Sequence, residues 1–301
     1  MSPLAARCGI GLILVTALTG CGDRASSASD SGQATSAVST VPVNITNWDL
    51  EAGSVMVVAL GDNVAIVLPQ VTDSTTPFPE SSGVQSDLAT DLFGKAGKIA
   101  SATGVTPATR APPGGDCVAW PAGQLKNPRS DWRVGFETGR VTGVPLDSLE
   151  GKAGADSAAL AASIAAAVAA LPSATNSDFR GLPFRVRSAQ TFRTDSIDVV
   201  IADVVRSVNE EANPRLEHYF VIAERPAGSS AKYRVGFFSR TAGAEDDAEI
   251  TELLAVVLVG PERRPAAVVN VEFDEGGTLG LLERTAPGQW RFRWRSAYTG
   301  C

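Results

Sequence analysis

The chain has 301 residues, with 26 Lys and Arg against 33 Asp and Glu, and a formal net charge of −7 at pH 7. This acidic balance argues against a nucleic-acid partner, because nucleic-acid binding depends on clustered Lys and Arg that neutralise phosphates. The chain has one histidine and four cysteines, too few for a site of several imidazoles or for paired cysteines at zinc-finger spacing. We therefore expect no cofactor and no transition-metal site.

The first twenty residues, MSPLAARCGIGLILVTALTG, have the layout of a secretory signal. One charge, Arg7, precedes an apolar run from Ile10 to Leu18, and small residues follow it. A charged head, an apolar core of about 7–15 residues and a small-residue exit are typical of a signal, and the run is shorter than the roughly 20 residues of a membrane span.

The tetrapeptide Leu18-Thr19-Gly20-Cys21 resembles the lipobox of bacterial lipoproteins. The resemblance implies cleavage of residues 1–20, a diacylglycerol on the thiol of Cys21 and an acyl chain, such as palmitate, on its amine. The partner would then be a membrane. Gly22 stands where Asp would retain an enterobacterial lipoprotein at the inner membrane, so the resemblance favours the cell outer membrane. The alternative is an ordinary cleaved signal or an uncleaved apolar start.

Residues 21–41 are expected to be a disordered tether. The segment from Gly22 to Thr40 is dominated by Ser, Ala, Thr, Gly and Asp and contains a single large apolar side chain, Val38. Such a composition cannot bury enough surface to order itself. A flexible chain of about 20 residues has a typical end-to-end distance of roughly 25 Å, which would hold the following domain off the bilayer.

The cysteine count indicates one disulfide. Cys8 leaves with the signal and Cys21 carries lipid, so Cys117 and Cys301 remain. Two cysteines in an oxidising compartment favour a bridge, here between the middle and the end of the chain. The alternative is two separate thiols.

Residues 42–125 are predicted to form an N-terminal β lobe. Two short apolar runs flank Gly61-Asp62-Asn63 within residues 54–70, which is a strong hairpin signal. Loops rich in Pro, Gly and Ser follow and mark the boundary to a C-terminal α+β lobe, residues 126–301.

One helix is expected, beginning near Asp156 as its cap and ending at Pro172. Leu160, Ile164 and Val168 repeat every four residues, and no charge occurs from Ser157 to Leu171. An uncharged helix of this length is usually buried, so we expect it to lie on a sheet. Contact with a membrane or a partner is the alternative.

The chain after this helix is expected to consist of about eight strands. Apolar runs cover residues 184–192, 195–208, 217–226, 231–240, 250–260, 265–273, 278–284 and 289–298. Their short connections favour hairpins, because parallel crossovers need a dozen or more residues. The predicted fold class is α+β, mainly an antiparallel meander in a curved sheet or partly closed barrel, with one conspicuous Ala-rich helix packed on it.

Signals for catalysis are weak. His218 stands at the start of a predicted strand, and the chain has no G-x-S-x-G elbow. The S-x-x-K spacing at Ser229–Lys232 falls in a predicted hairpin loop, whereas serine acylases place it at the start of a helix. We therefore predict no catalytic residue from these motifs.

Acidic residues gather in two predicted turns. One contains Glu210, Glu211 and Glu217, and the other contains Glu245, Asp246, Asp247 and Glu249. Solvated turn charges are the simplest interpretation. Asp246, Asp247 and Glu249 could hold calcium weakly, although their spacing does not match an EF-hand loop, and paired carboxylates could hydrolyse glycosidic bonds across a cleft.

The segment WRFRWR contains the most distinctive pattern. At strand period Trp290, Phe292 and Trp294 would share one face, and Arg291, Arg293 and Arg295 would stand in a row on the other. Guanidinium groups match carboxylates and phosphates, so the row could bind an anion. Alternatively, the row pairs with acidic residues of neighbouring strands, such as Glu272, Asp274 or Glu283.

Three functional hypotheses follow. The first, which we favour, is a non-catalytic envelope lipoprotein that binds or supports an envelope protein or glycan. The second is a small-ligand or anion-binding module that uses the arginine row. The third is a carboxylate-dependent hydrolase of envelope polysaccharide, and the sequence leaves it open whether the protein is an enzyme.

Overall fold

The structure is a computed structural model that describes residues 50–53, 55–60, 64–69, 89–107, 122–126, 128–175, 177–208, 214–244, 249–273, 276–296 and 299–300. All four cysteines lie outside these residues, as do the predicted signal and tether. Lipidation of Cys21 and a bridge between Cys117 and Cys301 therefore stay predictions.

The first described part is a seven-stranded antiparallel sheet with the order β4-β3-β7-β1-β2-β6-β5. Its strands are β1 (Val55–Ala59), β2 (Val64–Pro69), β3 (Ala89–Gly94), β4 (Gly97–Thr103), β5 (Val105–Pro107), β6 (Ala122–Leu125) and β7 (Val134–Glu137), and the short helix η1 (Leu50–Ala52) precedes them. β1 pairs with β2 from Val55 opposite Pro69 to Ala59 opposite Ala65. This pairing confirms the hairpin predicted for residues 54–70.

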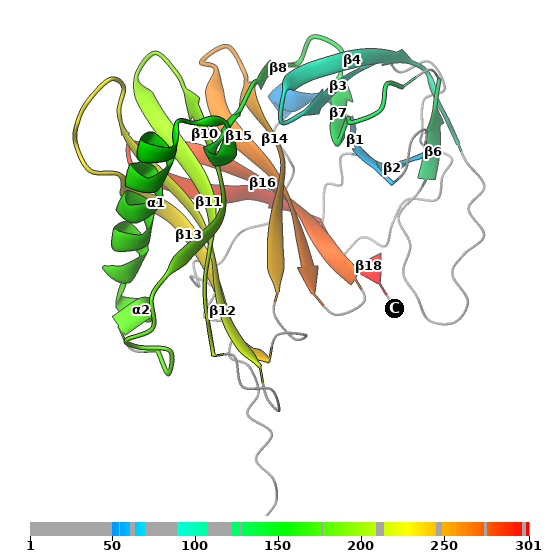
Figure 1. The fold of residues 1–301 in the computed structure, drawn as a ribbon. Coiled ribbons are helices and arrows are strands. Elements are labelled where there is room, and N and C mark those ends of the chain that lie inside the picture. Colours follow the sequence, from blue (N-terminus) through cyan, green and yellow to red (C-terminus); the bar gives the residue numbers. More distant parts are fainter. Residues whose placement is uncertain are drawn as a thin grey trace, which may run out of the picture. The chain divides into compact units, whose positions relative to one another are not determined.

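The expected eight-strand meander is present and is divided between two sheets (Figure 1). The five-stranded sheet has the order β13-β12-β11-β10-β9, and the six-stranded sheet has the order β17-β16-β15-β14-β8, with β18 on β16. The strands are β8 (Val141–Val144), β9 (Asp147–Ser148), β10 (Arg185–Arg193), β11 (Ile197–Val208), β12 (Arg215–Pro226), β13 (Arg234–Ala244), β14 (Ile250–Val259), β15 (Arg264–Phe273), β16 (Gly276–Ala286), β17 (Gln289–Arg295) and β18 (Thr299–Gly300). The antiparallel α+β fold with a curved sheet is thus confirmed.

A short segment, residues 134–148, contributes a strand to each sheet in turn. β7 belongs to the seven-stranded sheet, β8 pairs with β14 and β9 pairs with β10. Gly143 in β8 makes this passage possible, because a Cβ atom there would lie 2.6 Å from the backbone nitrogen of Lys98. The connection therefore ties the three sheets together within a few residues.

The predicted helix is α1 (Gly154–Ala169), and it lies on the five-stranded sheet (Figure 1). Ile164 and Val168 are buried against Val200, Tyr219 and Val221 of that sheet. The expected cap is wrong, because Ala153 occupies the cap position without a side-chain hydrogen bond and Asp156 lies in the first turn. There its carboxylate complements the positive end of the helix dipole. After a C-cap at Ala170, a one-turn helix α2 (Pro172–Thr175) follows, and the short helix η3 (Leu149–Gly151) precedes α1.

The central strands of both meander sheets, such as β11, β12 and β14, are buried on both faces. Between them lies an apolar core that includes Ile201 and Ile222 of the five-stranded sheet with Val269 and Trp290 of the six-stranded sheet. The other face of the six-stranded sheet packs on the seven-stranded sheet in a second core, formed by residues such as Met56, Phe93, Phe136, Val257 and Val268. Burial of both faces explains why residues 253–259, LLAVVLV, are continuously apolar.

Candidate functional site

The arginine row expected on β17 is split by a β-bulge. Phe292 pairs with Leu282 but Trp294 pairs with the adjacent Leu281, so the register shifts at Arg293. As a result Trp290 and Phe292 pack in the core between the two meander sheets, whereas Trp294 packs in the core on the other face of the six-stranded sheet. The geometry expected from strict alternation is therefore wrong.

The three arginines have different environments. Arg291 and Arg293 are exposed, and Glu283, the register partner of Arg291, accepts a hydrogen bond from Arg264. Arg295 lies with its guanidinium carbon 3.9 Å from the ring centre of Phe292. Its Nε is buried and has no hydrogen-bond partner among the described residues. Burial lowers the pKa of Arg295, against the opposing effect of Glu249.

The acidic turns do not provide a metal site in the described part of the chain. Glu210, Glu211, Asp246 and Asp247 lie outside it, and no group of three or more His, Asp and Glu residues suited to a metal occurs within it. Glu249 is half-buried, and burial raises the pKa of its carboxyl, with Arg295 and His218 acting in the opposite direction. Its backbone carbonyl accepts a hydrogen bond of 3.0 Å from the Thr241 hydroxyl.

His218 lies inside β12 and is buried, with 2% of its surface exposed. Its Nε2 lies 2.6 Å from Asp203 Oδ1 in β11, but the two atoms are not aligned for a hydrogen bond. Asp203 Oδ2 also accepts from Arg187 Nε at 2.6 Å. Burial alone would raise the pKa of Asp203, yet His218 and Arg187 together hold it below its ordinary value.

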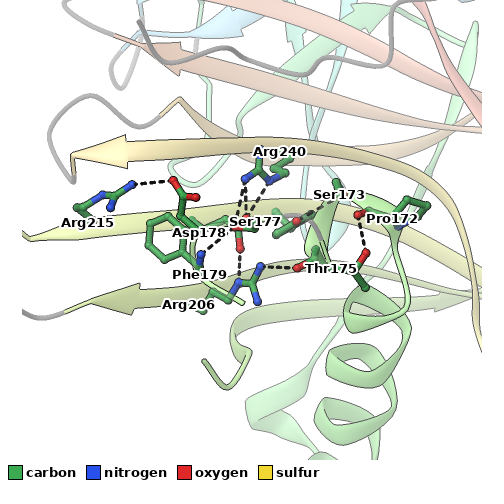
Figure 2. A network of polar contacts seen from close by, with 12 residues as sticks. Pro172, Ser173, Thr175, Ser177, Asp178, Phe179, Arg206, Arg215 and Arg240 are labelled. Carbon is green, nitrogen blue, oxygen red and sulfur yellow. Dashed lines mark hydrogen bonds and ion pairs between the residues drawn. The ribbon is translucent and has the colours of Figure 1, made fainter. Parts of the chain in front are cut away.

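Glu217, which the sequence places at a hairpin tip, is fully buried inside β12 and paired with two arginines. Its carboxylate accepts hydrogen bonds from Arg206 Nε and, at 2.8 Å, from Arg240 Nε. The two arginines also bind the segment that contains α2 (Figure 2): Arg206 donates to the Ala174 carbonyl at 2.8 Å, and Arg240 donates to the Ser177 hydroxyl at 3.4 Å. The expectation of a solvated turn charge is wrong for Glu217. A carboxylate enclosed in this way positions the chain and is closed to a substrate.

A cavity of about 770 Å³ lies at the end of the meander where the β10–β11, β12–β13 and β14–β15 turns come together. These turns lie along the upper edge of the two sheets in Figure 1. Apolar side chains such as Val144, Ile197 and Leu258 line it, together with Thr194, Asp195 and Ser196 of the β10–β11 turn. Ligand pockets in proteins typically measure about 300–1,000 Å³, so this cavity has the size of a ligand site.

Four arginines also line this cavity: Arg193, Arg263, Arg264 and Arg284. Three of them are held by buried carboxylates. Arg193 Nε lies 2.5 Å from Asp198, Arg284 binds Glu224 with two hydrogen bonds of 2.8 and 2.9 Å, and Arg264 pairs with Glu283. The pKa of Arg193 and that of Arg264 are raised, mainly by these hydrogen bonds. The side chains of Arg264 and Arg284 are only 26% and 19% exposed, so their carboxylates hold them in place and this part of the cavity wall is preorganised.

Arg263 differs from the other three arginines. Its exposed side chain has no hydrogen bond or ion pair with the part of the chain that the structure describes. Its backbone φ is +52°, in the left-handed region that residues other than Gly rarely adopt. Arg263 closes the β14–β15 turn, where its N–H donates to the Gly260 carbonyl at 3.0 Å.

The cavity arginines are not among the residues predicted from the sequence. The predicted arginines lie on β17, whereas the cavity is assembled by turns that are far apart in the chain. The available signal was the basic tetrapeptide Glu262-Arg263-Arg264-Pro265 between two apolar runs. A charged turn at the end of a buried hairpin is common, so this signal alone does not distinguish a binding site from a solvated turn.

Comparisons of the chain with protein-family models, with curated proteins and with solved structures found no match. Within the described residues, no helix is both long enough and apolar enough to span a bilayer. The assignment of function therefore depends on the site itself.

Proposed function

We propose that the protein is a lipid-anchored, non-catalytic binding module of the bacterial cell envelope, and that the cavity at the turn end of the meander is its ligand site. The observation that carries the proposal is the cavity of about 770 Å³ with its arginine-containing wall. Fixed polar groups around a partly apolar space are the usual composition of a ligand site.

The anchoring part of the proposal is supported by the sequence. The lipobox-like Leu18-Thr19-Gly20-Cys21 and the polar segment that follows it fit a protein tethered to the outer membrane through Cys21. Metabolic labelling of cells with radioactive palmitate tests this point. We expect label in the wild-type protein and none in Cys21→Ala, which should also leave the membrane fraction. Equal labelling of the two forms would contradict the anchor.

The binding part is tested with a blocking variant. Ser196 is exposed and lines the cavity, so Ser196→Trp places a bulky side chain at it. Ser230→Trp is the matched control, because Ser230 is also exposed in a turn at the same end but does not line the cavity. Both proteins would be purified as full-length mature lipoproteins in detergent, and their thermal unfolding would first be compared with the wild type.

The measurement is native mass spectrometry after exposure to a low-molecular-mass extract of envelope material. We expect a bound species on the wild type and on Ser230→Trp that is absent from Ser196→Trp. If every species that binds the wild type also binds Ser196→Trp, the cavity is not the ligand site.

A further inference from the structure

We propose that Arg263 recognises the anionic group of the cavity's ligand, and that this ligand is a small hydroxylated anion of the sugar phosphate or sugar acid class. The inference rests on the proposed function, because it names the chemistry of the molecule that the cavity would bind. The anion-binding module predicted from the sequence used the arginines of β17, whereas Arg263 lies in the β14–β15 turn.

The other cavity arginines are already paired with carboxylates of the protein. Arg284 uses two of its nitrogens on Glu224, and Arg264 contacts Glu283, Glu51 and Glu262. Their charges are therefore compensated by the protein. Arg263 alone among the four has no acidic neighbour within ion-pair distance in the described ranges, so its guanidinium can meet a ligand's phosphate or carboxylate with paired N–H donors.

The backbone of Arg263 has an unusual conformation, with φ at +52°. A positive φ suits Gly or Asn, and a long side chain there costs conformational energy. Such a cost is tolerated where the residue has a function that a residue better suited to the turn would not provide. Arg263 lines this cavity and also a neighbouring hollow of about 510 Å³, which Arg140 lines as well.

The β10–β11 turn carries polar groups that can bind the rest of the ligand. In the β10–β11 turn, Thr194 Oγ1 accepts weak hydrogen bonds from the backbone N–H groups of Ser196 and Ile197, at 3.4 and 3.3 Å. Its hydroxyl hydrogen is left to donate. The exposed Asp195 carboxylate beside it has no hydrogen bond or ion pair with any described residue, so it can accept from hydroxyl groups. A ligand with one anionic group and several hydroxyl groups could bind Arg263 through the anionic group and Thr194 and Asp195 through its hydroxyl groups.

The probes are glucose 6-phosphate, glucuronate and glucose, titrated calorimetrically into the full-length mature lipoprotein in detergent. We expect the two anions to bind, and glucose to bind about 10- to 100-fold more weakly, the range expected for one lost charged hydrogen bond. Tighter binding of glucose 6-phosphate assigns a phosphate as the anionic group, and tighter binding of glucuronate assigns a carboxylate.

The variants separate charge from structure. Arg263→Asn removes the guanidinium and keeps a residue that tolerates positive φ, so we expect unchanged or higher thermal stability and a loss of anion affinity of about 10- to 100-fold. Arg291→Asn is the matched control, because Arg291 is exposed on β17 outside the cavity, and it should bind as the wild type does.

The outcomes distinguish the two proposals. Anion binding that survives in Arg263→Asn, or binding of glucose as tight as that of the anions, overturns the role of Arg263. If that binding is still blocked by Ser196→Trp, the proposed function stands. If no probe binds, the sugar-anion inference fails, and the envelope extract then decides the proposed function separately.

Discussion

His218 Nε2 and Asp203 Oδ1 lie 2.6 Å apart on adjacent strands, on the face of the five-stranded sheet that is turned toward the six-stranded sheet. The pair is buried, since His218 is 2% exposed and the Asp203 side chain 12%. Arg187 contacts the second oxygen of the same carboxylate. The pair therefore lies in a polar part of the space between the two sheets, which also holds Arg187, and its removal should lower the stability of the protein.

Asp203→Asn should lower the free energy of unfolding at pH 7 by about 1–3 kcal/mol, because Arg187 then loses the charged acceptor of its hydrogen bond and the buried His218 loses its carboxylate neighbour. The pKa of Asp203 is lowered in the folded state. The stabilisation of the folded state by ionised Asp203 is therefore fully present above the unfolded pKa of about 3.9. This stabilisation is lost as the pH falls through the lower pKa of the folded state. Urea unfolding at pH 7 and pH 3 should show a difference from the wild type that shrinks at the lower pH.

Asp195→Asn, at an exposed turn, is the control and should change stability by less than about 0.5 kcal/mol. The single histidine adds a second measurement, because its Hε1 proton gives one NMR signal per protein. That signal should shift in Asp203→Asn and remain in place in Asp195→Asn. Equal unfolding curves for wild type and Asp203→Asn at pH 7 would contradict the assigned role.

The Arg206, Glu217 and Arg240 group leads to a larger expected effect. Glu217→Gln leaves two guanidinium groups beside an uncharged amide in a site where Glu217 is 0% and Arg206 3% exposed. Breaking a buried ion pair by changing one partner typically costs about 3–5 kcal/mol. Guanidinium chloride unfolding should therefore show a markedly lower midpoint.

The control for this experiment is Glu252→Gln. Glu252 accepts two hydrogen bonds of 2.7 Å from Arg133, but the two side chains are 39% and 46% exposed. Exposed pairs contribute about 0–1 kcal/mol, so this variant should unfold nearly as the wild type does. A similar loss in both variants would show that burial does not set the strength of the Glu217 group.

Much of this fold could be predicted from residue patterns, because periodicity reports burial. The eight strands after residue 184 and the helix containing Ile164 and Val168 follow from apolar spacing alone. The bulge at Arg293 could not be predicted in this way, since it depends on which residue of β16 each residue of β17 meets. One additional residue moves Trp294 from the core that holds Trp290 to a different one.

The buried ion pairs were also not predicted from the sequence, although the sequence contains a signal for them. Arg206 and Glu217 occupy positions in phase with inward-facing apolar residues, such as Val204 and Tyr219. A charged residue at a strand position whose side chain faces inward indicates a buried ion pair. Its partner comes from a neighbouring strand, so the partner is known only once the strand register is known. The cavity arginines lie in or next to turns, where no such alternation of inward and outward positions exists.

The packing of α1 on the five-stranded sheet should depend mainly on its two buried residues, Ile164 and Val168. Ile164 is 1% exposed and packs in the core with Val200 and Val221. Ile164→Ala should cost about 2–5 kcal/mol, because it removes buried volume that the sheet cannot refill. Ala159→Ser, on the exposed face of the same helix, should cost about 0.5 kcal/mol or less. Thermal unfolding followed by circular dichroism checks both, and comparable losses in the two variants would show that α1 contributes little packing.

Glu224 stabilises the fold and also holds Arg284, which lines the cavity. Its carboxylate, 6% exposed, accepts hydrogen bonds from Arg284, from the Gly288 backbone N–H at 2.6 Å and from Trp290 Nε1 at 3.0 Å. Burial opposes the charge of Glu224, but these donors outweigh it and lower the pKa. Its stabilising contribution is therefore present above the unfolded pKa of about 4.3 and is lost as the pH falls through the folded value.

Glu224→Gln should reduce the free energy of unfolding at pH 7 by about 2–4 kcal/mol, because Arg284 then keeps its charge beside a neutral amide. The difference from the wild type should narrow in urea titrations as the pH falls below the unfolded pKa of about 4.3 and then through the lower folded pKa, where the wild-type carboxyl takes up a proton. Glu262→Gln is the matched control, since Glu262 is 76% exposed and lies 3.6 Å from Arg264, and it should change stability by about 0–1 kcal/mol. A loss in Glu224→Gln that stays constant from pH 7 to pH 3 would show that the charge of Glu224 is not what holds Arg284 at the cavity.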